Sequence, residues 1–173
     1  MDEQAALPLT AALAEAAEQD RDQACLDSAL RFLANRPRSE REIRRRLAEK
    51  GYEPDRVDRV IEKLIRLKLV DDRMFAEYWL ENRALHRPKG VRALRAELFA
   101  KGVGREVVEG ALEGERDEPE DAYRAAQRQA SRWPLTDETT FKQRLSLFLQ
   151  RRGFGWEAIE AASNRLWDER SGG

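Results

Sequence analysis

The stretch Ile43-Arg-Arg-Arg-Leu47-Ala-Glu-Lys-Gly51-Tyr52 decides the fold, because the chain carries three copies of its pattern. The second copy is Leu94-Arg-Ala-Glu-Leu98-Phe-Ala-Lys-Gly102-Val103, and the third is Leu145-Ser-Leu-Phe-Leu149-Gln-Arg-Arg-Gly153-Phe154. The matching leucines are 51 residues apart, and so are the matching glycines and the β-branched residues at 57, 108 and 159. So many ungapped matches are not coincidence, and they indicate tandem repeats.

Each copy predicts a helix, a glycine stop and a second helix. Two apolar residues four positions apart lie on one helical face. The glycine that follows a basic residue supplies the left-handed conformation that ends helices. Ser39 and Glu42 predict a capping box before the first of these helices, Thr140 and Gln143 offer the same device in the third copy, and Pro54 suits a helix's opening turn. Apolar residues upstream of each copy predict one more helix, near 26–33, 75–79 and 122–129.

The predicted fold is therefore all-α, with three tandem three-helix repeats that resemble helix-turn-helix units and form an elongated, curved array. Strand signals are nearly absent. We place an acidic, Ala-rich N-terminal arm at 1–21 and the repeats at 22–71, 72–117 and 118–170. The segment 114–120, which contains Gly and Pro, is the expected flexible joint.

Composition narrows the class of protein. With 173 residues and 38% of them charged, and a mean hydropathy of −0.77, the chain suits slender helical modules rather than a deep, enclosed active site. The one cysteine excludes an intramolecular disulfide and a cysteine-based metal cluster. There is no apolar run of transmembrane length and no leader pattern, so we expect a soluble, cytoplasmic protein, and a monomer.

Candidate catalytic residues are scarce. The only histidine, His86, has no orienting partner nearby in sequence and reads as a loop residue. Cys25 is expected to fill a small gap in a half-buried helix face. The pair Asp71-Asp72 suits an acidic helix start better than a metal site. We therefore expect no enzyme activity, no metal and no cofactor.

Basic residues are the stronger functional signal, because charge is segregated along the chain. Residues 82–105 hold seven Lys or Arg against Glu97 alone, whereas 1–28 and 106–121 are acidic. Such charges can simply be a solvated helical face, but their recurrence in successive repeats favours binding to a polyanion or a repeating acidic surface. Aromatic residues do not alternate with these charges and sit mainly at core-like spacings, with Trp133 a possible exception, so no base-stacking platform is indicated. The candidate partner-binding or DNA-binding residues are Arg36, Arg38, Arg44, Arg45, Arg83, Arg87, Lys89, Arg92, Arg95, Lys101, Arg144, Arg151 and Arg152.

Four segments occur in a fixed order along the chain: 36–51, 69–76, the Arg87-Pro-Lys-Gly90 connection, and 94–103. In these segments the chain resembles the RecX family of regulatory proteins, bacterial modulators of the RecA recombinase. The resemblance implies a cytoplasmic protein that binds RecA and the RecA–DNA filament and limits strand exchange and ATPase activity. It brings no catalytic residues.

Two functions therefore stand at this point. The first is a RecA regulator, and the alternative is a helical-repeat protein that binds DNA directly, since basic helix-turn-helix units do so. A further hypothesis is that the acidic arm mimics nucleic acid and covers basic faces at rest.

Overall fold

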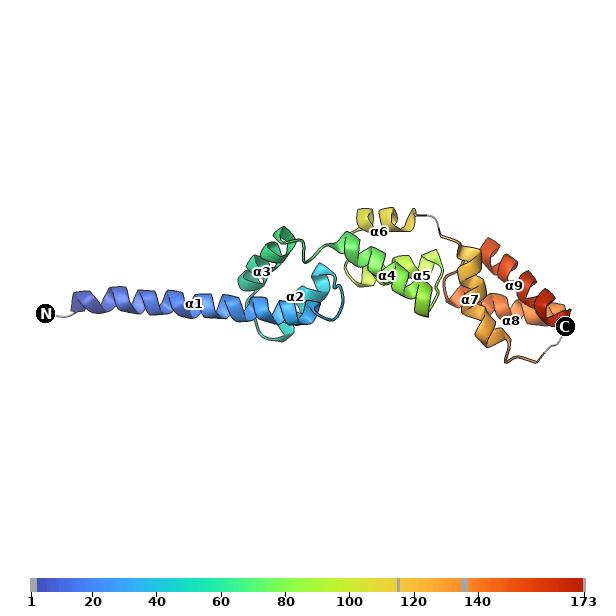
Figure 1. The fold of residues 1–173 in the computed structure, drawn as a ribbon, viewed down its shortest axis with the longest axis horizontal. Helices are drawn as coiled ribbons and strands as arrows, with labels where there is room; N and C mark the ends of the chain where they lie inside the picture. Colours follow the sequence, from blue (N-terminus) through green and yellow to red (C-terminus); the bar gives the residue numbers. More distant parts are fainter. Residues whose placement is uncertain (1–2, 115, 135–136, 173) are drawn as a thin grey trace. The chain divides into compact units, whose positions relative to one another are not determined.

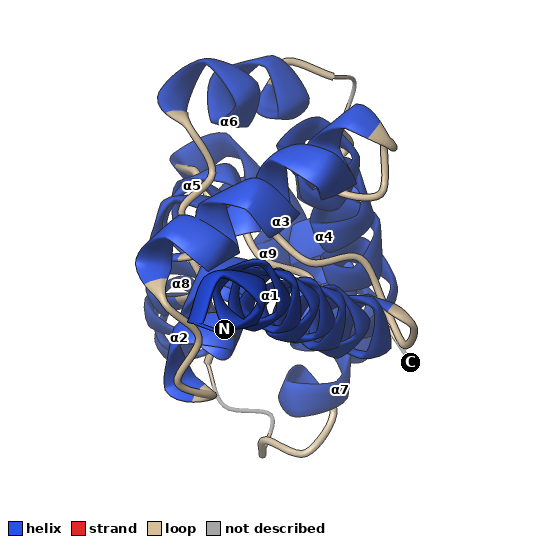
Figure 2. Cartoon of the chain, turned by 90° about the vertical axis from the view of Figure 1, so that its left-hand side faces the viewer, coloured by secondary structure: helices blue, strands red, loops and turns tan. Residues whose placement is uncertain are grey.

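The computed structural model describes residues 3–114, 116–134 and 137–172, and within them the chain forms nine helices and no strand (Figures 1 and 2). This confirms the all-α prediction. The helices are α1 (Glu3–Leu33), α2 (Glu40–Glu49), α3 (Pro54–Arg66), α4 (Asp72–His86), α5 (Val91–Ala100), α6 (Arg105–Leu112), α7 (Glu118–Ala130), α8 (Glu138–Arg151) and α9 (Trp156–Ser171). Three successive helices make one repeat.

The repeated glycines act as predicted. Gly51, Gly102 and Gly153 have φ angles of 81°, 86° and 83°, the left-handed region in which an L side chain is strained. Each ends the middle helix of its repeat, so the offset of 51 residues reflects one turn geometry used three times.

Helix starts are confirmed in the first repeat and corrected in the third. Ser39 and Glu42 form the predicted capping box, and Pro54 is the first residue of α3. In the third repeat, however, Asp137 is the N-cap of α8, and its carboxylate accepts the Thr140 N–H at 2.9 Å. A carboxylate three residues earlier takes the free amide, so the predicted Thr140–Gln143 box does not form.

The chain divides into two compact units, Met1–Asp72 and Arg73–Gly173. The first holds α1–α3 around a core that includes Cys25, Ile43, Leu47 and Ile61. The part of α1 before this core, residues 10–21, is exposed and extends beyond α2 and α3 (Figure 1). The arm predicted at 1–21 thus continues without a break into the first helix of repeat 1.

The second unit holds repeats 2 and 3, each with its own core. Phe75, Leu94 and Leu98 lie in the repeat 2 core, whereas Phe141 and Leu145 lie in the repeat 3 core. The repeats on both sides of the expected joint at 114–120 belong to one compact unit, and residues 118–120 form the first turn of α7. Glu115 lies outside the described residues.

A close backbone approach joins repeats 2 and 3. The Gly90 N–H donates to the Arg152 carbonyl oxygen at 3.1 Å. A Cβ at Gly90 would lie 2.2 Å from the Gly153 carbonyl oxygen, a distance that no methyl group tolerates. The Glu118 carboxylate also accepts the N–H of Val91, the first residue of α5, at 3.0 Å. The two repeats are therefore held in a defined register.

Candidate partner-binding surface

The predicted cations of repeat 1 are largely engaged within the protein. Arg36 pairs with Glu42, with 3.3 Å between the guanidinium and carboxylate. Arg44 pairs with both Glu40 and Asp58, and Arg45 pairs with Glu49 across one exposed helical turn. Arg38 lies over the Phe32 ring at 4.0 Å and donates to the Phe32 carbonyl oxygen. These contacts help hold repeat 1 together, and the carboxylate partners of Arg36, Arg44 and Arg45 partly neutralise their charges.

Glu97 neutralises two of the predicted cations of repeat 2. Its carboxylate accepts hydrogen bonds from Arg83 at 2.7 Å, from Lys89, and from the Trp79 indole N–H at 2.9 Å. Burial alone would raise the pKa of Glu97, but the hydrogen bonds from Lys89, Arg83 and Trp79 outweigh it and lower the pKa. The carboxylate is therefore charged at neutral pH and fixes the loop between α4 and α5 onto α5.

Three further predicted cations also have partners in the second unit. Arg95 forms two parallel hydrogen bonds to Glu109, each 2.9 Å long. Lys101 lies over the Trp79 ring at 4.9 Å, and Arg144 lies over the Trp133 ring at 4.3 Å. Such stacked cations keep their charge while their stems pack on the ring.

Of the remaining four predicted cations, Arg87, Arg92 and Arg152 lie where repeats 2 and 3 meet, and Arg151 precedes Arg152 at the end of α8. We call the four the basic seam: Arg87, Arg92, Arg151 and Arg152. The Arg92 guanidinium donates to the Gln150 carbonyl oxygen at 3.0 Å, and the Gly90–Arg152 hydrogen bond brings the two segments together. Within the described residues, none of the four forms an ion pair with a carboxylate. The structure thus unites residues about 60 positions apart in sequence into one basic surface.

Electrostatics within the seam are repulsive. Arg152 is half-buried and lies over the Phe148 ring at 4.6 Å. Burial, and then the positive charge of Arg87, lower the pKa of Arg152. An anion placed between the two guanidinium groups would relieve this repulsion and would gain hydrogen bonds from planar donors.

An apolar pocket on repeat 3 was not foreseen from the sequence. It has a volume of about 490 Å³ and is lined by Lys142, Gln143, Ser146, Leu147 and Trp156. Trp156 and Leu147 are 67% and 56% exposed. The core-like spacing predicted for most aromatic residues does not hold for Trp156, whereas Trp133, the predicted exception, is buried in the repeat 3 core. Trp156 opens α9 at its N-terminus, one turn before the buried face that Ile159 and Ala162 define.

Two of the other candidates for chemistry, Cys25 and Asp72, have structural roles. Cys25 is fully buried, and burial raises the pKa of its thiol, which keeps the thiol protonated. Asp72 begins α4, and its carboxylate accepts the Glu40 N–H at 2.9 Å. His86 is exposed at the end of α4. In the part of the chain that the structure describes, no group of three or more His, Cys, Asp or Glu side chains is placed to hold a metal ion, and no helix has the length and apolar character needed to cross a bilayer.

Comparison with known proteins assigns the repeats to one family. Family models match the first, second and third three-helix domains of RecX at residues 25–64, 71–112 and 116–162. Regulatory protein RecX of Mycolicibacterium vanbaalenii is 37% identical over 174 aligned residues, covering 95% of each chain. That of Chlorobium limicola is 34% identical, covering 80% of this chain and 87% of its own.

A solved structure supports the fold. The crystal structure of RecX from Lactobacillus salivarius matches with a TM-score of 0.74 at 23% identity, over 86% of this chain and 97% of that one. With three consecutive domain matches and two relatives above 30% identity over most of their length, the chain belongs to the RecX family of regulatory proteins.

Proposed function

We propose that this protein binds RecA and the RecA–DNA filament and restrains strand exchange and ATP hydrolysis, and that it does so by binding alone, without catalysis. It would act as a cytoplasmic monomer in recombination, DNA repair and the SOS response. The observation that carries the proposal is that all three RecX domains are present in order and that a group of arginines in repeats 2 and 3 has no carboxylate partner among the residues that the structure describes.

The basic seam is the part of the surface that we assign to the partner. Cations already paired with Glu97 or Glu109 would have to break those pairs before they could bind elsewhere. Arg87, Arg92, Arg151 and Arg152 carry no such cost, because no described carboxylate pairs with them. The adjoining repeat 3 pocket, with exposed Trp156 and Leu147, would add an apolar anchor of the type common at the centre of protein interfaces.

The test is RecA ATPase activity on single-stranded DNA, with wild-type protein and with the charge reversal R92E/R151E. We expect wild-type protein to slow hydrolysis below one molecule per RecA subunit and the variant to lose at least about tenfold in potency, since like charges at an interface cost several kcal/mol. R128E/R132E is the matched control: it makes the same charge change at two exposed positions outside the seam, Arg128 in the last turn of α7 and Arg132 just after that helix. Equal potency of R92E/R151E and wild type, with the fold intact by circular dichroism, would contradict the assignment of the seam.

Direct DNA binding is the alternative function. It is favoured by the arginines of the basic seam, which no described carboxylate neutralises and which could bind phosphates. It predicts binding to naked DNA that weakens steeply with salt, because each neutralised phosphate releases counterions. If R92E/R151E lost DNA binding but retained full RecA inhibition, the seam would be a DNA site and RecA would bind elsewhere.

A further inference from the structure

Helix α3 carries a row of cations that the sequence analysis did not single out. Arg56, Arg59, Lys63 and Arg66, here the α3 stripe, fall within about 80° of one another around the helix and span about 15 Å along it. The carboxylates of α3 lie on the adjoining arc: Asp55, Asp58 and Glu62. Among the described residues none of these pairs with a stripe residue, and Asp58 pairs with Arg44 of α2 instead.

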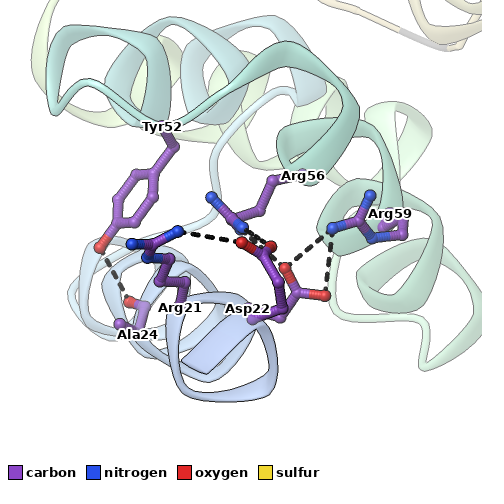
Figure 3. Close-up of polar contacts among 7 residues, drawn as sticks. Arg21, Asp22, Ala24, Tyr52, Arg56 and Arg59 are labelled. Carbon is purple, nitrogen blue, oxygen red and sulfur yellow. Dashed lines mark hydrogen bonds and ion pairs between the residues drawn. The ribbon is translucent and has the colours of Figure 1, made fainter. Parts of the chain in front are cut away.

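The acidic N-terminal helix occupies one half of this stripe (Figure 3). The Asp22 carboxylate accepts a hydrogen bond from Arg56 at 2.7 Å and two from the Arg59 guanidinium at 2.9 and 3.2 Å. Glu18, one helical turn earlier, pairs with Arg56 as well. The hydrogen bonds from Arg59 and Arg56 lower the pKa of Asp22, so its charge persists at any physiological pH.

The other half of the stripe is open. Lys63 and Arg66 are exposed, and neither forms an ion pair within the described residues of the first unit. A groove of about 200 Å³ between α1 and α3 is lined by Asp22, Arg59 and Lys63 among others, so it runs from the occupied half toward the open one.

The contact that covers the first half of the stripe lies at the edge of the first unit, where α1 leaves the core. Residues 10–21 of α1 are exposed, and α1 enters the core only from Cys25 onward. Tyr52 fixes the helix at that point, since its hydroxyl donates to the Ala24 carbonyl oxygen at 3.1 Å (Figure 3). Glu18, Asp22 and Arg59 are each about half-exposed, so the pair between Asp22 and Arg59 is weak and screened by salt. Arg56 is only 11% exposed, so its pairs with Glu18 and Asp22 are the stronger part of the contact.

We propose that the α3 stripe is a phosphate-binding surface for a single-stranded nucleic acid, and that Glu18 and Asp22 occupy its first half as a built-in competitor. Carboxylates one turn apart on α1 present to Arg56 and Arg59 two negative charges in a row, as a phosphodiester chain does. Displacement of the outer part of α1 frees Arg56 and Arg59, so that with the open Lys63 and Arg66 four cations become available on one helical face. The match to the first three-helix domain of RecX begins at residue 25, so Glu18 and Asp22 lie outside the part of the chain that this domain model covers.

A phosphodiester chain fits better than an acidic protein surface. Four cations in one row along about 15 Å match a linear, regularly charged ligand. Exposed apolar side chains, which mark the centre of protein interfaces, do not flank the row on its core side, because Val60 and Leu64 are buried. Ile65 is 45% exposed, but it lies about 100° around the helix from Arg66, outside the row.

The test measures binding of the full chain to fluorescein-labelled single-stranded DNA by anisotropy at about 50 mM salt. The variant E18Q/D22N removes both competing charges. Its matched control, E15Q/D20N, removes two charges from exposed α1 residues for which the structure shows no ion pair to α3. We expect E18Q/D22N to bind about three- to tenfold more tightly than wild type, and E15Q/D20N to gain less than about twofold. Adding K63A/R66A to E18Q/D22N should abolish the gain.

Each other outcome overturns the proposal. Equal gains in E18Q/D22N and E15Q/D20N would mean a general charge effect without a site. No gain in E18Q/D22N, with helix content preserved, would mean that α1 does not compete. If E18Q/D22N improves binding of a labelled poly-glutamate peptide but not of DNA, the stripe binds an acidic protein surface instead. Because RecA is absent from the assay, these results stand apart from the test of the proposed function.

Discussion

Replacing Gly90 with alanine should separate repeats 2 and 3 without altering any charge. The added Cβ would lie 2.2 Å from the Gly153 carbonyl oxygen and 2.3 Å from the Phe154 Cα. These are backbone atoms, so no side-chain rotation can relieve the clash, and the basic seam must open. Gly104→Ala is a matched control: both glycines are helix N-caps with extended backbone, but a Cβ at Gly104 meets no atom within 4 Å.

Both variants lose stability because alanine replaces a glycine N-cap, but only Gly90→Ala also overpacks the contact between repeats 2 and 3. Alanine is a poorer N-cap than glycine, at about 1 kcal/mol in either case. Gly90→Ala should lower the stability by a further amount of about 1–3 kcal/mol, the cost of overpacking together with loss of the Gly90 hydrogen bond to Arg152. With a urea m-value of about 1.5 kcal/mol/M, an extra 2 kcal/mol lowers the unfolding midpoint by about 1.3 M relative to Gly104→Ala. Tryptophan fluorescence is the assay, because all four tryptophans lie in Arg73–Gly173. Equal urea midpoints for the two variants would refute the close backbone approach between Gly90 and Gly153.

Three further predictions concern the polar contacts. Glu97→Gln should destabilise the second unit by about 1 kcal/mol at pH 7, since it removes the charge that Arg83 and Lys89 share. The pKa of Glu97 is lowered in the folded protein, so the stability that its charge contributes is present above about pH 4.3 and is lost as the pH falls further. The urea midpoints of wild type and E97Q should therefore converge in acid. A constant difference between the two midpoints at all pH values would mean that the pKa shift is absent. Ser39→Ala should lower the stability of the first unit by about 1 kcal/mol, because it removes the capping box. Hydrogen exchange of the α2 amides should become faster, and unchanged exchange would contradict this prediction. Arg95→Ala should raise the pKa of Glu109 toward its usual value, followed by NMR titration of the carboxyl carbon, whereas Arg92→Ala should leave it unchanged.

The repeat could be predicted from sequence because its signals are local. Glycine adopts the left-handed conformation without steric strain, so Gly51, Gly102 and Gly153 mark three helix ends whatever tertiary structure follows. The capping box of Ser39 and Glu42 is likewise decided within four residues. Such features depend on backbone conformation rather than on tertiary contacts.

The binding surface could be predicted only in part because charge neutralisation depends on packing. The predicted set treated Arg92 and Arg95 alike, yet α6 brings Glu109 to Arg95 while Arg92 meets a main-chain oxygen of repeat 3. The partners are 14 and 58 residues away, beyond any periodicity within one helix. The α3 stripe did leave a helical signal, with cations at 56, 59, 63 and 66, but the contact with Asp22 emerges only when α1 packs on α3.

The most direct test of the account is the RecA ATPase titration. Wild-type protein is predicted to slow hydrolysis on single-stranded DNA at amounts below one molecule per RecA subunit, and R92E/R151E is predicted to require at least about tenfold more protein for the same effect. Unchanged hydrolysis with wild-type protein in excess over RecA would contradict the proposed function, whatever the variants do.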